Sequence, residues 1–190
     1  MARGTNDYGR VEGGARHVAE LPSYVTAPAG VLVMPAGDSI LSILNPAASG
    51  FIAKVRRITV TLGADGGTFN DQPTFKIHRI TAHGTGTAVT PRPFDTADAA
   101  AACTARSNLT VEPGYGVQLG VWMQNLYSDN AVGQKYAGTT TIEFRIFDYV
   151  SGGPGKPLTL REGEGLTIEV DVNPGGTLMT TVIEHTEEPA

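Results

Sequence analysis

Strict alternation of apolar and polar residues is the feature that most constrains the fold of this chain. It is most regular from Leu166 to Val172, and Gly116 to Met123 and Thr139 to Val150 show the same period of two. That period places one set of side chains on each face of a β-strand, and it is typical of antiparallel sheets with one face in the core. Four residues of the most regular segment are expected to point inward: Leu166, Ile168, Val170 and Val172.

Turn-forming residues separate these segments along the chain. Clusters of Gly, Pro, Asn and Ser recur, for example at residues 45–50, 151–155 and 173–176. The sequence therefore predicts an all-β fold, a jelly-roll or Greek-key β-sandwich of about eight strands with an extended N-terminal arm. The 190 residues suffice for one such domain, which we place at residues 21–190.

The longest predicted strand, Phe51 to Leu62, has an interrupted alternation. Its apolar residues change phase at Arg56-Arg57. A β-bulge at this pair would bring both apolar sets to the same face of the strand, because a bulge inserts one extra residue. We therefore expect a bulge there.

Residues 1–20 show no period that could bury a face, and they are rich in Gly and charged residues. A frayed terminus is one interpretation. The other is an arm that becomes ordered on a neighbouring subunit. On the second interpretation, the arm binds its partner through Arg3, Tyr8, Arg10 and Arg16.

The stretch from Ala82 to Ser107 is predicted to be the longest irregular part. Its prolines exclude a regular central strand, and its Ala-rich run predicts one or two helical turns with Asp95 or Thr96 as the N-cap. Long loops of this kind usually bind something. We expect this one to reach a neighbour through Pro91 and Phe94, and we add the single tryptophan, Trp122, as a core or interface residue.

Composition excludes several classes of function. A net charge of −5 with scattered basic residues argues against nucleic-acid binding. One cysteine, Cys103, permits no intrachain disulfide and no cluster of cysteines around a metal, and the four histidines lack metal-ligand spacing. No secretory signal or membrane-spanning segment is visible. Without a nucleophile motif or a paired-carboxylate site, we expect no enzyme, no catalytic residue and no cofactor or metal.

Two motifs resemble structural proteins of tailed-phage virions. One is NPAASGFIAKVRRITVTL, with Asn45, Pro46, Ser49, Gly50 and Arg56-Arg57-Ile58, and the other is PLTLREGEGLTIEVDVNPG, with the turn Leu160 to Leu166. The segment Thr85 to Pro91 is similar as well, so the resemblance covers about two-thirds of the chain. It implies a capsid decoration, or cement, protein: a jelly roll, commonly trimeric, made in the host cytoplasm and bound to the major capsid protein or another virion protein on the capsid surface.

Two other functions stay open at this stage. A trimeric phage fibre or tail protein, or a module that binds host glycans, is suggested by Tyr115, Trp122 and Tyr127 beside turn loops. An enzyme on a cupin-like scaffold would need a His-x-His pair, which this chain lacks.

Overall fold

The computed structural model describes residues 21–33, 35–64, 74–111, 114–123, 141–149, 156–172 and 177–190. The arm, residues 1–20, lies outside the described residues. Regular structure in the described part is all β, and no helix there could cross a membrane. The strands are β1 (Ser23–Thr26), β2 (Leu32–Val33), β3 (Ser39–Leu44), β4 (Phe51–Ala64), β5 (Thr74–Ile80), β6 (Thr85–Val89), β7 (Arg92–Pro93), β8 (Thr104–Val111), β9 (Gln118–Met123), β10 (Thr141–Asp148), β11 (Leu158–Leu160), β12 (Gly165–Val172) and β13 (Thr177–Pro189).

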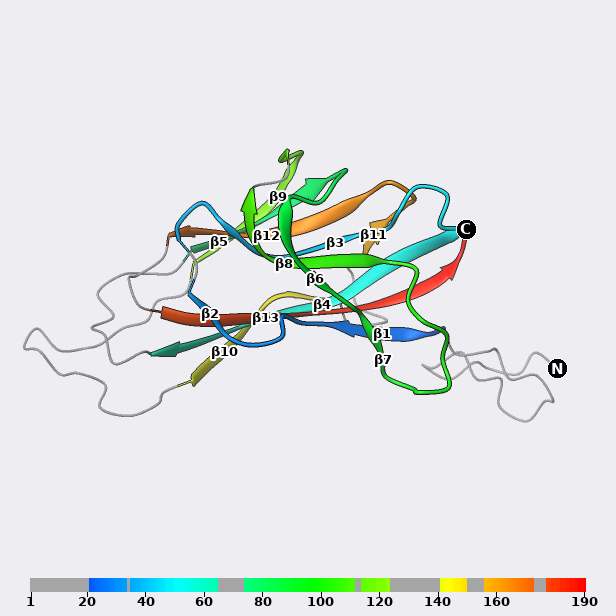
Figure 1. Cartoon of the computed structure of the whole chain (residues 1–190), viewed down its shortest axis with the longest axis horizontal. Helices are drawn as coiled ribbons and strands as arrows, with labels where there is room; N and C mark the ends of the chain where they lie inside the picture. The colour runs from blue at the N-terminus through cyan, green and yellow to red at the C-terminus, as the bar shows by residue number, and fades with distance from the viewer. Residues whose placement is uncertain are drawn as a thin grey trace, which may run out of the picture.

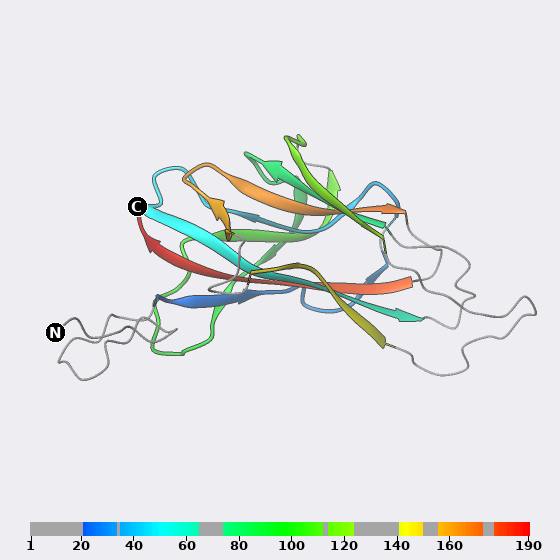
Figure 2. The same ribbon diagram turned by 180° about the vertical axis from the view of Figure 1, so that it is seen from behind.

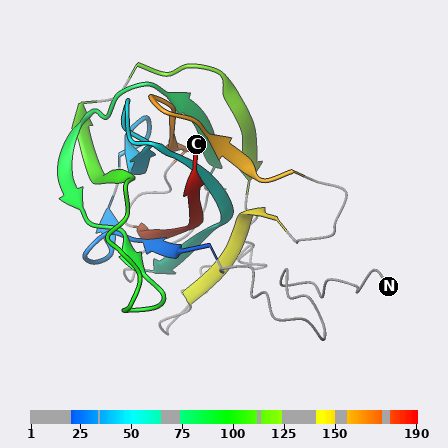
Figure 3. The ribbon, with the colours of Figure 1, turned by 90° about the vertical axis from the view of Figure 1, so that its right-hand side faces the viewer.

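These strands form two antiparallel sheets that pack as a sandwich (Figures 1 and 2). Sheet I has seven strands, in the order β10-β4-β13-β1-β7, with β11 paired to β4 and β2 paired to β13. Sheet II has six strands, in the order β6-β8-β3-β12-β5-β9. A view along the long axis shows the strands surrounding a common interior (Figure 3). The predicted all-β sandwich is therefore confirmed.

The core lies between the sheets, and the alternation of β12 largely predicts it. Leu166, Ile168 and Val170 are completely buried in one apolar cluster that spans both sheets. Val172 was expected inward but is 40% exposed, because β12 ends there at the rim of the sandwich.

The predicted bulge in β4 is confirmed. Along the pairing with β13, Glu184 lies opposite Arg57 and the next residue, His185, lies opposite Val55. Arg56 is therefore the extra residue. The bulge brings the apolar residues before and after Arg56 to one face of β4. Five of them belong to the core: Ala53, Val55, Ile58, Val60 and Leu62.

The prediction of an irregular stretch from Ala82 to Ser107 was wrong in two respects. The stretch contains β6, β7 and the start of β8, and β7 is a two-residue edge strand that tolerates its proline. No helix forms in the Ala-rich run. Asp95 instead caps a single turn, accepting a hydrogen bond from the Ala97 N–H at 2.9 Å. A run this short cannot offset the cost of helix nucleation, and part of its backbone is bonded to β13, as described next.

Candidate functional site

The inner face of β13 carries two ionisable residues into the end of the core. His185 and Glu187 lie opposite Val55 and Ala53, which face the interior, so both side chains point between the sheets. Close to them lies the thiol of Cys103, the residue immediately before β8 of sheet II. All three residues are buried, and their ligand atoms lie within 4.8 Å of one another. We call these three residues the Glu187 cluster.

Glu187 is the hub of this cluster. Its two carboxylate oxygens accept hydrogen bonds from the backbone N–H groups of Ala102 at 2.8 Å and Cys103 at 2.9 Å. The Nε2 atom of His185 lies 3.3 Å from Oε1 of the same carboxylate. A charged acceptor deep in the protein thus fixes the backbone that leads into β8.

The surroundings set the protonation states of this cluster. Burial alone raises the pKa of the Glu187 carboxyl, but the hydrogen bonds from His185 and from the two backbone N–H groups outweigh it and lower the pKa to about 2. Burial, followed by the nearby Glu187 charge, raises the pKa of the Cys103 thiol well above its usual range. Glu187 is therefore an anion beside a neutral thiol.

Tyr24 of β1 also helps to attach the loop of residues 94–103 to sheet I. Its ring stacks on the His185 ring, with centroids 5.3 Å apart, and its hydroxyl donates to the carbonyl of Ala99 at 3.1 Å. The N–H of Phe94 donates to the carbonyl of Ser23 at 2.9 Å. The loop of residues 94–103 is therefore tied to sheet I at its beginning, middle and end.

The predicted partner-binding residues fall in different places. Arg3, Tyr8, Arg10 and Arg16 lie outside the described residues. Trp122 lies in β9, where its backbone pairs with Phe75 of β5, and its side chain is outside the described part. Pro91 is buried in the turn between β6 and β7, because the chain passes there from one sheet to the other. A buried proline offers little surface to a partner, so the position of Pro91 does not support that assignment.

Phe94, another of the predicted partner-binding residues, lies on the surface. Its side chain is 61% exposed, at the start of the tied loop. Two residues earlier, Arg92 lines a cleft of about 440 Å³, which opens where β1 and β7 meet β6 and β8 and is lined mostly by small residues. Arg92 contributes the charge of this cleft and, within the residues the structure describes, makes no ion pair.

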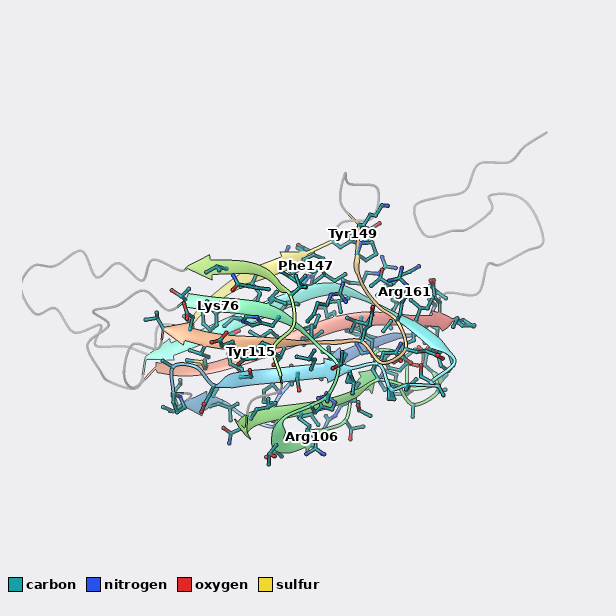
Figure 4. All side chains as sticks on the ribbon, turned by 90° about the horizontal axis from the view of Figure 1, so that it is seen from above. Lys76, Arg106, Tyr115, Phe147, Tyr149 and Arg161 are labelled. Carbon is teal, nitrogen blue, oxygen red and sulfur yellow. The ribbon has the colours of Figure 1, made fainter. Side chains whose placement is uncertain are left out.

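The outer face of sheet II holds a second polar group, away from the Glu187 cluster. His78 lies on this outer face but is only 7% exposed, and its Nε2 lies 2.6 Å from Oε2 of Glu169. The reason is Tyr115, labelled in Figure 4, which precedes β9. Its ring stacks on the His78 ring, with centroids 4.3 Å apart. At the edge of the group, Lys76 pairs with Asp171 at 2.5 Å. These contacts link β5, β12 and the segment before β9, so the group stabilises sheet II, although Nδ1 of His78 has no hydrogen-bond partner among the described residues.

Sequence reasoning missed the Glu187 cluster. A usable sign was present, because His185-x-Glu187 on a strand places both side chains on the same face. The third member, Cys103, is 84 positions from Glu187, and only the fold brings it near.

Because the Cys103 thiol is neutral and buried, a nucleophilic role for it is unfavourable. The reactivity of this thiol tests its burial directly. We expect Cys103 in the native protein to react with a disulfide reagent such as DTNB about a hundredfold or more slowly than in urea, because reaction needs local opening and thiolate formation. The release of thionitrobenzoate, followed by absorbance, measures both rates. Fast stoichiometric reaction of the native protein would contradict the burial of this thiol.

Comparisons with known proteins returned nothing: no family model matches the sequence, and no curated protein or solved structure matches the chain. The residues and geometry of this chain therefore carry the functional argument alone.

Proposed function

We propose that this chain is a structural protein that binds neighbouring proteins in an assembly. Phe94 is the observation that carries the proposal. A large aromatic side chain, 61% exposed, lies on a loop that is tied to the core by a buried carboxylate. Aromatic anchors dominate the energetics of protein interfaces, and an anchor on a fixed loop loses little conformational entropy on binding.

The surroundings of Phe94 support the same function. Arg92 lies in the adjoining cleft, and arginine is enriched at interface hot spots along with aromatic residues. A partner segment could place small side chains in the cleft and a carboxylate near Arg92. In contrast, the ionisable groups of the Glu187 cluster are buried, so they offer no surface to a partner protein.

The specific assembly that we propose is a phage capsid, with the chain as a decoration protein bound to the major capsid protein, as a trimer. The resemblance of the segments around Arg56 and Leu160 to virion proteins supports this choice. So does the sandwich, because a compact domain with a projecting anchor can gain avidity from many repeated contacts on a shell. On this proposal the chain is not an enzyme and resides on the virion.

Phe94→Ser tests the anchor. We expect the variant to bind at least about thirtyfold more weakly to empty heads assembled from the capsid protein of the same genome, because a central aromatic hot spot contributes about 2 kcal/mol or more. Cosedimentation with heads measures the dissociation constant, and light scattering measures the native mass.

The matched control is Val117→Ser, which removes an apolar side chain that is 71% exposed at the far end of sheet II. This control should bind like the wild type. Absence of wild-type binding to heads would overturn the capsid assignment, and equal losses in both variants would remove Phe94 from the interface.

A glycan-binding module is the second candidate, favoured by Tyr115. Its ring lies flat on His78 and remains 38% exposed, as an aromatic platform for a sugar would be. A glycan array screened with the full chain separates the two functions. Reproducible hits that disappear in Tyr115→Ala would support the module, whereas a blank array would leave the assembly function.

A further inference from the structure

We propose that the Glu187 cluster is a zinc site formed by the Cys103 thiolate, a ring nitrogen of His185 and the Glu187 carboxylate. Sulfur, imidazole and carboxylate form a typical donor set for Zn²⁺, whereas Ca²⁺ and Mg²⁺ prefer oxygen ligands alone. The inference does not depend on the interaction proposed for Phe94.

The geometry is close to what the metal requires. Bond lengths of about 2.0–2.3 Å in a tetrahedron place ligand atoms roughly 3.3–3.8 Å apart. The three ligand atoms already lie within 4.8 Å of one another, so contraction by about 1 Å suffices. A water or the second oxygen of Glu187 would fill the fourth position.

The surroundings orient the ligands as the outer shell of a metal site does. Backbone N–H groups of Ala102 and Cys103 hold the carboxylate, and the Tyr24 ring holds the imidazole by stacking. Partners of this kind fix ligand orientation in metalloproteins. The Oε2 atom of Glu187 accepts the hydrogen bond from Ala102 and keeps a second lone pair, so Glu187 can still bind a cation.

Hydrogen bonds leave His185 incompletely satisfied, although Nδ1 of the buried His78 is unpaired among the described residues in the same way. The side chain of His185 is completely buried, and its Nδ1 has no hydrogen-bond partner among the described residues. The other ring nitrogen, Nε2, makes only a long contact of 3.3 Å to Glu187. Buried imidazole nitrogens are normally satisfied, because an unpaired buried polar atom costs free energy. A metal bound to Nε2, the nitrogen that faces Glu187, would replace this long contact with a short bond.

Charge balance favours a divalent ion. When Zn²⁺ forms its bond to sulfur, the Cys103 thiol proton leaves to solvent. The thiolate and Glu187 then supply two negative charges, so the buried site becomes neutral overall. Bound zinc would join the start of β8 to β13 and stabilise the loop that carries Phe94.

Sequence reasoning gave no expectation of a metal here, because it looked for several cysteines or a His-x-His pair. The proposed site instead combines one cysteine with the His-x-Glu of a single strand.

Metal titration of the full chain tests the site. We expect one equivalent of Zn²⁺ by elemental analysis after dialysis, and one equivalent of Co²⁺ with a thiolate-to-cobalt charge-transfer band in the near ultraviolet. Saturating Zn²⁺ should raise the melting temperature by several degrees, since a ligand that binds only the folded state stabilises it.

Variants identify the ligands. Cys103→Ser and His185→Gln should each abolish the charge-transfer band and the zinc-dependent shift. The control is His78→Gln, which alters the other buried His–Glu pair and should retain both. Circular dichroism verifies that each variant is folded. If the wild type binds no stoichiometric metal, or if Co²⁺ binds without the charge-transfer band, the proposal is overturned, whichever way the variants behave.

Discussion

Gly165→Ala is expected to lower the free energy of unfolding by about 3 kcal/mol or more, because overpacking against backbone in a sheet interior is costly. Gly165 begins β12, the strand between β3 and β5 in sheet II. A Cβ atom at this position would lie 2.4 Å from the carbonyl oxygen of Ile43 and 2.9 Å from Cγ1 of Ile80. The carbonyl belongs to a paired strand and cannot rotate away, so β12 would have to separate from β3. Urea denaturation measures the loss.

Gly30→Ala is the control for this substitution. No atom lies within 4 Å of the Cβ position at Gly30, and its φ is not in the left-handed region. That variant should unfold within about 0.5 kcal/mol of the wild type, or be slightly more stable because alanine restricts the unfolded chain. Equal behaviour of the two variants would show that β12 and β3 do not approach as closely as described.

The two glycines of the turn before β12 show what sequence reasoning can and cannot provide. The pattern Glu162-Gly163-Glu164-Gly165 predicts a turn. Gly163 fulfils that role, with a φ of 76° that other residues adopt at a cost. Gly165 instead permits close approach of two strands distant in the sequence, and composition does not distinguish these two reasons for a glycine.

Local periodicity predicted the inner faces well. The alternation of β12 and the phase change at Arg56 are properties of consecutive residues, so the buried faces and the bulge follow from them. The outer faces were harder to predict. His78 and Glu169 occupy polar positions of their strands and are nevertheless buried: they pair with each other, and Tyr115 stacks on His78 from a segment that precedes another strand. Which loop folds over which face depends on the tertiary structure.

The same limit applies to the candidate site. Phe94 was predicted from the length of its loop, but the reason that the loop is fixed lies in Glu187, at the other end of the chain. The last residues of the chain are acidic, yet β13 runs to Pro189 and pairs with β4 along its whole length. A charged residue near a terminus normally suggests a solvated end. Here it is buried because sheet I continues to the end of the chain.

Glu187→Gln should destabilise the protein by about 3 kcal/mol when measured in a chelator, which removes any contribution of bound metal. The amide retains the shape of the carboxylate but replaces one acceptor oxygen with a donor. Either the Ala102 or the Cys103 N–H then faces an N–H group in a buried place, and an unsatisfied buried donor costs about 1–3 kcal/mol, to which the lost charge-assisted bond adds. The midpoint and slope of urea denaturation give the change.

Glu188→Gln is the matched control, since it makes the same chemical change one residue further along β13. Glu188 pairs with Lys54 near the surface, with about a quarter of each side chain exposed. Exposed ion pairs contribute about 0–1 kcal/mol, so this variant should remain close to the wild type. If both variants lost the same stability, the burial of Glu187 would not be the cause.

Glu187→Gln should also weaken binding to heads about tenfold, although Phe94 itself is unchanged. A loop released from its buried anchor samples more conformations, and the entropy of fixing it again is then lost on binding. The dissociation constant of folded Glu187→Gln is compared with those of Phe94→Ser and Glu188→Gln. Phe94→Ser removes the contact that the aromatic ring makes with the partner, whereas Glu187→Gln leaves the ring in place and releases the loop that holds it. Unchanged affinity in the destabilised variant would mean that Phe94 binds without a fixed loop, and the role of Glu187 would then be confined to the stability of the fold.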